Sequence, residues 1–204
     1  MNLSTLSILL GLGLCVPQVF GLLKPRAFTL AVRGFARSTP VGVFLMVIGT
    51  GWFLWNVNTE AASDFASYKD KMMIFFAAIG LGTCIVVRDF LAVRGLAIVF
   101  LCLAKFMVDT ARWADTEWRL VIVVWAYVLV VAGMWFTISP WRCRDLLEWA
   151  TATEQRIKYG CAARLAFGLL VVALGLTAFR SAEQRALNQA SVRSPQPVTL
   201  AALP

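Results

Sequence analysis

The chain has 204 residues, of which 60% are apolar and 15% charged, and its formal net charge is +8. A soluble domain is about half apolar and a quarter charged, so this composition indicates an integral membrane protein. The basic excess does not indicate a nucleic-acid-binding protein, because the charges lie at the ends of apolar stretches, where they set topology and contact anionic lipid. Histidine is absent, which excludes His-ligated haem or metal and Ser-His or Cys-His catalytic pairs within this chain.

Six apolar stretches are long enough, or nearly long enough, to cross a bilayer, which takes about 20 residues. Tryptophans near the ends of most of them match the aromatic belts of a membrane interface. We predict an all-α membrane bundle of about six transmembrane helices in one domain, residues 1–180, followed by a mobile polar tail at 181–204. The spans are expected at about 3–23, 41–57, 71–87, 93–113, 120–138 and 161–179.

The distribution of lysine and arginine predicts the orientation. The connections after the first, third and fifth spans hold eleven of these residues, against four after the second and fourth. By the positive-inside rule the first group faces the cytoplasm, which places both termini on the non-cytoplasmic side. Three arginines in the tail argue the other way. We expect a multi-pass protein of the bacterial cytoplasmic (inner) membrane.

Two cytoplasmic connections have amphipathic patterns. If 24–40 forms a helix, Arg26, Arg33 and Arg37 share one face, opposite a face of phenylalanine, valine and alanine. This pattern predicts a helix in the headgroup plane, with its arginines on lipid phosphates and its apolar side in the acyl region. The connection 139–160 is predicted to form a second interfacial helix.

Within the second interfacial helix, Arg144 and Glu148 are expected to form an i,i+4 pair. Cys143 lies between Arg142 and Arg144, so its thiol either has a lowered pKa or is an ordinary interfacial residue. The five cysteines form no CxxC pair, and neither a disulfide framework nor a zinc site is expected.

Both connections open with a proline, follow a span and lead into a span that contains glycines. We interpret this as an internal repeat, 1–58 and 120–180, with both copies in the same orientation and a tight hairpin at 71–113 between them. Such repeats are common in transporters and also occur in inert scaffolds. The alternative is that the two patterns arose independently, because any cytoplasmic connection favours them.

The second copy carries SPWR at 139–142, then a basic and acidic amphipathic stretch, then RLAFGLLVV at 164–172. With these features the hairpin at 130–180, and with it 1–58, resembles the YjeT-like small two-span bacterial inner-membrane proteins. Those have a proline and basic residues in the loop and a glycine-rich second span. This chain lacks their run of adjacent glycines. The family has no established activity, so the resemblance implies an inner-membrane hairpin and no chemistry.

Lys105, Asp109 and Arg112 form the candidate intramembrane polar site. If Arg94 marks the cytoplasmic interface, Lys105 lies roughly 16 Å deeper, near the midplane. A lone lysine there costs about 2.5 to 3.5 kcal/mol, which a carboxylate one turn away offsets in part. Three interpretations stay open: a snorkelling lysine with an Asp109–Arg112 pair at the outer interface, an acidic partner protein that meets the lysine, or a polar path or anion site with Asp109 as counter-ion.

These patterns favour a non-catalytic accessory or assembly subunit of a larger inner-membrane complex. The alternative is a small transporter or channel for a polar or ionic solute that uses Lys105 and Asp109. It ranks second because the other spans offer few polar groups near the midplane beyond Gln18, Thr50 and Tyr127. Expected partners are anionic lipid headgroups and other membrane subunits, and no nucleic acid. We expect no catalytic, cofactor or metal site.

Overall fold

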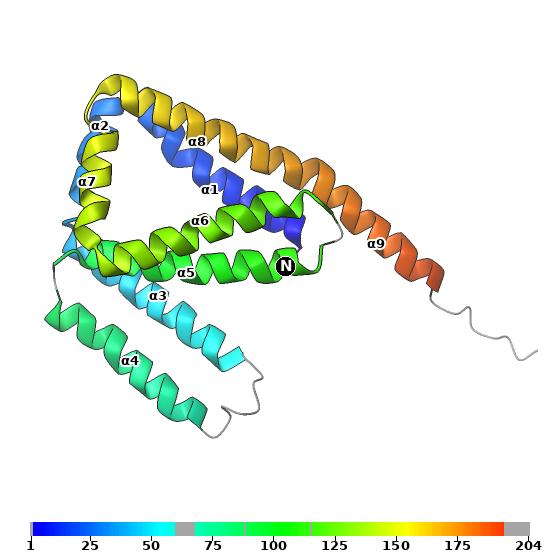
Figure 1. The fold of residues 1–204 in the computed structure, drawn as a ribbon, viewed down its shortest axis with the longest axis horizontal. Helices are drawn as coiled ribbons and strands as arrows, with labels where there is room; N and C mark the ends of the chain where they lie inside the picture. Colours follow the sequence, from blue (N-terminus) through cyan, green and yellow to red (C-terminus); the bar gives the residue numbers. More distant parts are fainter. Residues whose placement is uncertain (1, 60–67, 88, 115, 194–204) are drawn as a thin grey trace, which may run out of the picture.

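The protein is described by a computed structural model, in which residues 2–59, 68–87, 89–114 and 116–193 are placed. Within those residues the chain is helical, without β-strands, and its long helices run back and forth between two ends of the molecule (Figure 1). The elements are α1 (Leu3–Leu23), α2 (Pro25–Phe35), α3 (Thr39–Thr59), α4 (Lys69–Val86), α5 (Leu91–Arg112), α6 (Arg119–Ile138), α7 (Pro140–Ala150), α8 (Glu154–Leu174), the π-helical segment η2 (Gly175–Phe179) and α9 (Arg180–Arg193).

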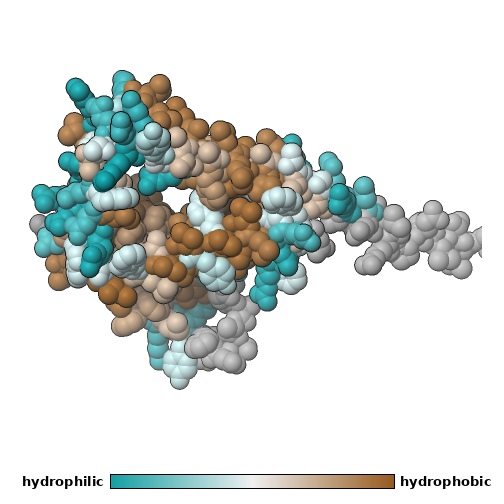
Figure 2. Space-filling view, turned by 45° about the horizontal axis from the view of Figure 1, so that its top comes forward, coloured by the Kyte–Doolittle hydropathy of each residue, from teal (hydrophilic) through white to brown (hydrophobic). Residues whose placement is uncertain are grey.

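Among the described residues, five segments are long and apolar enough to cross a membrane, as expected for a multi-pass membrane protein. They are α1, α3, α5, α6 and the continuous run Glu154–Arg185. The predicted span at 71–87 corresponds to α4, which is shorter, with 18 residues, and begins with Lys69, Asp70 and Lys71. Figure 2 shows a broad apolar band, with hydrophilic residues gathered at the end that holds α2 and α7. We call this end, which contains most of the lysines and arginines of the connections between spans, the basic end.

Small residues bring α1 and α8 into backbone contact. A Cβ added at Gly11 would lie 2.7 Å from the carbonyl oxygen of Gly168, and one added at Gly168 would lie 2.6 Å from the Cys15 sulfur. Ser4 Oγ donates a hydrogen bond of 2.9 Å to the Gly175 carbonyl across the same seam. In lipid there is no hydrophobic drive between helices, so close packing and such hydrogen bonds hold the pair together.

Helix α5 is the most buried of the five candidate spans and lies between α3 and α6. It touches α3 closely, because a Cβ at Gly42 would lie 2.7 Å from the Ala92 nitrogen and one at Gly95 would lie 2.8 Å from the Met46 nitrogen. On its other side a Cβ at Gly133 of α6 would lie 3.1 Å from a backbone oxygen of α5. These three helices therefore form one tightly packed layer.

The α1–α8 pair meets this layer at the end opposite α2 and α7. A buried cluster there joins α1, α5, α6, α8 and η2, with Leu6, Met107 and Phe179 among its members. Trp125 of α6 packs edge-on against Phe167 of α8, with ring centroids 5.2 Å apart. Toward the basic end the pair and the layer diverge, and α2 and α7 bridge them (Figure 1).

The hairpin expected at 71–113 corresponds to α4 and α5. Helix α4 packs along α3, not closely along α5, which follows it in sequence. A Cβ at Gly80 of α4 would lie 2.5 Å from the Thr50 hydroxyl of α3, so the absence of a side chain there allows the close approach. Before α5 the chain reverses through Phe90 in a left-handed conformation (φ 54°). Helices α4 and α5 follow each other in sequence without packing closely together, and each packs along α3 instead.

The polar tail predicted to be mobile begins as a helix. The chain continues from α8 through η2 into α9 without a break, as far as Arg193. The Glu183 carboxylate of α9 accepts a 3.1 Å hydrogen bond from the backbone nitrogen of Ser4, in the first turn of α1. An acid at that position satisfies an unpaired helix donor and complements the helix dipole. Residues 194–204 of the predicted tail lie outside the described residues.

Candidate functional site

An apolar groove of about 430 Å³ lies between α3, α4 and α5. Its walls are mainly aliphatic and aromatic, and its polar groups include Thr50 and Asn56 of α3 and Lys105 of α5. The Asn56 side-chain amide donates to the Trp52 carbonyl at 3.1 Å, one turn back on its own helix. The groove follows from the position of α4, which touches α3 and leaves the adjoining face of α5 open.

Lys105 and Asp109 form an ion pair beside this groove. Their side chains are one turn apart on α5, with 2.7 Å between the lysine Nζ and a carboxylate oxygen. The side chains are 42% and 53% exposed. The third member of the predicted cluster, Arg112, lies elsewhere: its guanidinium sits 5.7 Å from the Trp113 ring centroid. Among the described residues, Asp109 therefore pairs with the lysine, and the alternative Asp109–Arg112 pair is not formed.

The depth of the ion pair can be read along α5. Lys105 precedes Arg112, the last residue of the helix, by seven residues, which is roughly 10 Å at 1.5 Å per residue. Lys105 therefore lies within the helix, whereas Asp109, three residues before Arg112, lies in its last turn. Inside a bilayer, a half-exposed pair at that position is costly unless protein or water covers it. The ion pair is therefore a polar feature beside an apolar groove.

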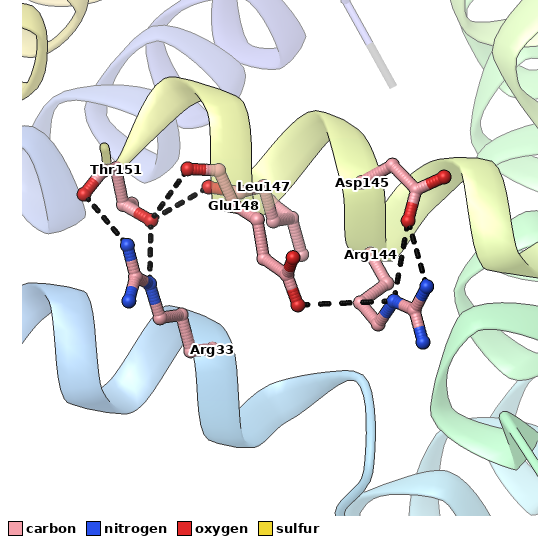
Figure 3. A network of polar contacts seen from close by, with 6 residues as sticks. All are labelled: Arg33, Arg144, Asp145, Leu147, Glu148 and Thr151. Atoms are coloured by element: carbon pink, nitrogen blue, oxygen red, sulfur yellow. Dashed lines mark hydrogen bonds and ion pairs between the residues drawn. The ribbon is translucent and has the colours of Figure 1, made fainter.

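A second polar feature ties α2 to α7 at the basic end (Figure 3). Arg33 Nε donates to the Thr151 hydroxyl and a terminal nitrogen donates to the Thr151 carbonyl, both at 3.0 Å. Thr151 is the C-cap residue of α7, so the guanidinium supplies a donor to a helix end that lacks one. These two bonds use two of the five N–H donors of an exposed guanidinium, so the expectation that Arg33 also faces lipid phosphates stays a prediction.

The other two arginines of that predicted set have different surroundings. Arg26 forms a 3.3 Å ion pair with Glu154 at the start of α8, with side chains 92% and 56% exposed, so the pair adds little stability. Arg37 follows α2 and is exposed. Sequence reasoning missed Thr151, which lies 118 residues from Arg33 and carries no local signal for a contact across the fold.

Helix α7 has its own charge network. Arg144 pairs with Asp145 at 2.9 Å and with Glu148 at 3.7 Å, the second being the predicted i,i+4 pair (Figure 3). Cys143 is buried, and burial raises the pKa of its thiol. The alternative of a thiol activated by its flanking arginines is therefore wrong, because desolvation dominates. A neutral buried thiol of this kind acts as a small apolar residue.

The chemistry available is limited. Among the described residues, no group of three or more histidine, cysteine, aspartate or glutamate side chains is placed to hold a metal ion. Comparison of the chain with known protein families, curated proteins and solved structures found no match. The geometry of the groove, the ion pair and the basic end therefore carries the functional proposal.

Proposed function

We propose that this chain is a non-catalytic integral membrane accessory or assembly subunit of a larger bacterial inner-membrane complex. The half-exposed Lys105–Asp109 pair within α5 carries the proposal. An apolar face needs no partner in lipid, whereas an ion pair there needs a polar cover. A partner helix with a polar or acidic side chain, seated beside the groove, supplies that cover.

Helix α4 sets the shape of the surface beside the ion pair. This helix is held mainly by α3, and much of its surface is exposed, including Ile74, Phe75 and Ile85. The groove between α4 and α5 leaves a long apolar surface next to the ion pair. A neighbouring subunit that fits this surface places apolar side chains in the groove and a polar group at Lys105. The proposed partner surface is therefore apolar, with one polar group opposite Lys105.

We further propose that α4 is a sixth span and that the basic end faces the cytoplasm. The connections at that end contain most of the loop lysines and arginines, as the positive-inside rule requires of a cytoplasmic side. Both termini then lie outside, and α2 and α7 lie at the headgroup level, where the exposed Arg37 meets anionic lipid.

We also propose that 1–58 and 120–180 are two copies of an internal repeat. Helices α2 and α7 each begin with a proline and pack against each other. The first span of each copy would pack against the last span of the other in the same way if the repeat were symmetric. Helix α1 packs directly on α8, whereas α5 separates α3 from α6. On this proposal α5 is inserted between the two copies. On this proposal the α6–α7–α8 unit derives from a two-span hairpin like those of the YjeT-like proteins, which 130–180 resembles. The resemblance implies no activity.

One observation favours the alternative, a small transporter or channel. Lys105 lines a groove of about 430 Å³, and an anionic solute there would compete with Asp109 for the lysine. The mainly apolar lining argues against a polar path, because transporters gather polar groups from both repeats around the solute. Transport therefore remains the second candidate.

Site-specific photo-crosslinking tests the subunit proposal. We expect a photoreactive amino acid at Ile79, an exposed residue of the groove, to give one discrete protein adduct in intact cells. The same probe at Leu169, exposed on α8, serves as the control and should give lipid adducts only. Replacing both Lys105 and Asp109 by leucine should abolish the adduct at Ile79. Lipid adducts alone at both positions would count against a partner.

A further inference from the structure

We infer that the basic end holds a binding site for one anionic phospholipid, in a pocket between α2, α7 and the first turns of α8. This α2–α7–α8 pocket has a volume of about 350 Å³. Phe28 and Val32 of α2 form one wall, and Leu147 of α7 and Ile157 of α8 contribute others. The inference goes beyond the subunit proposal and does not depend on it.

The pocket is positively charged. Arg156 and Arg164 of α8 both line it, and its described lining contains no acidic residue. The nearest acid in sequence, Glu154, is engaged by Arg26 at 3.3 Å. The acids of α7 are likewise engaged by an arginine of their own helix. Two cations therefore face the pocket without acids of the lining to neutralise them.

One of the two arginines is oriented by an aromatic ring. The Arg156 guanidinium lies 5.2 Å from the centroid of the Trp149 ring, a cation–π contact. Stacking fixes the plane of the guanidinium and leaves its N–H edges available for two parallel hydrogen bonds to a phosphate. Arg164 lies about two helical turns further along α8 and extends the basic wall.

The remaining walls select the occupant. Tyr159 and Trp149 belong to the class of side chains that concentrate at the headgroup level of a membrane. Phe28 and Val32, on the apolar face of α2, offer a surface for the upper part of an acyl chain. A free phosphate ion would leave these apolar walls uncovered, and a zwitterionic headgroup would bring a third cationic group toward the two arginines. An anionic phospholipid satisfies both halves of the pocket.

Native mass spectrometry of the purified full-length chain tests this site. The protein is equilibrated with equal amounts of phosphatidylglycerol and phosphatidylcholine, and the bound lipid is counted. We expect one tightly retained phosphatidylglycerol. Replacing Arg156 and Arg164 by glutamine should lower its affinity about fivefold for each arginine, or about 25-fold together. The control removes the same charge at the same end but outside the pocket, through Arg142→Gln with Lys158→Gln, and should change the affinity less than about twofold.

Each other outcome overturns the site. An equal loss of phosphatidylglycerol affinity in the control variant would show that the lipid is attracted to the basic surface as a whole. Equal retention of phosphatidylcholine and phosphatidylglycerol would show that the pocket does not select anionic lipid. Displacement of the lipid by millimolar inorganic phosphate would identify a free anion as the occupant instead. If the glutamine pair does not fold, Arg156→Lys decides the question, because it keeps the charge and loses the planar stack. That variant should lose affinity about fivefold, and unchanged affinity would contradict the site.

Discussion

Replacing Gly11 by leucine should separate α1 from α8, whereas Gly13→Leu, two residues away, should leave the pair intact. A Cβ at Gly11 would lie 2.7 Å from the Gly168 carbonyl oxygen and 3.1 Å from the Val172 nitrogen. These are backbone atoms, so the clash cannot be relieved by a side-chain rotation. At Gly13 nothing lies within 4 Å of the added carbon.

The expected cost at Gly11 is at least the 1 to 3 kcal/mol typical of overpacking, since whole helices must move apart. Thermal unfolding in mild detergent, followed by tryptophan fluorescence and by protease resistance, measures it. A lowered midpoint for Gly11→Leu and an unchanged one for Gly13→Leu is the expected pattern. Equal stability of the two variants would show that the α1–α8 seam is not packed as described.

Replacing Lys105 alone by leucine should destabilise the chain more than replacing Lys105 and Asp109 together. The single substitution leaves the Asp109 carboxylate without the lysine that lies 2.7 Å away. An uncompensated charge costs about 2.5 to 3.5 kcal/mol at the centre of a span on insertion scales, and we expect a smaller cost of the same sign for Asp109 in the last turn of α5. The double substitution removes both charges, and exchanging an ion pair for apolar residues is often neutral or stabilising in a low-dielectric setting.

The wild-type chain, the Lys105→Leu variant and the double variant are compared in two measurements. One is membrane insertion of the α5 segment in the full-length chain, and the other is unfolding of the purified protein. Recovery of near wild-type behaviour in the double variant is the expected result. If the double variant is as unstable as the single one, the two residues act independently and the ion pair is not the relevant feature.

The apolar stretches predicted most of the helices, because the length needed to cross a bilayer and the requirement for internal backbone hydrogen bonds leave few alternatives. The expected 3–23 coincides with α1 (Leu3–Leu23), and the amphipathic connections contain α2 and α7. Glycines were harder to interpret. Gly11 and Gly13 look equivalent in sequence, yet one meets a neighbouring backbone and the other meets nothing. Only the placement of the partner helix separates them.

The candidate site shows the same limit. An amphipathic pattern identifies the face that carries Arg33, but not whether lipid or another helix meets that face, and its partner Thr151 is remote in sequence. The lysine and acid of α5, by contrast, were found from their spacing alone, because residues four apart on a helix are neighbours. The sequence predicts pairs within one helix, but it does not predict which side chains meet between helices.

The most direct test of the subunit proposal is purification of the tagged chain in mild detergent, with mass measurement of the intact particle. The Lys105→Leu, Asp109→Leu double variant is the comparison, because it is expected to fold. We predict a wild-type particle that contains a stoichiometric partner, and a folded double variant that has lost it. A wild-type chain that purifies as a stable particle without other proteins would contradict the proposal and direct attention to solute uptake in vesicles.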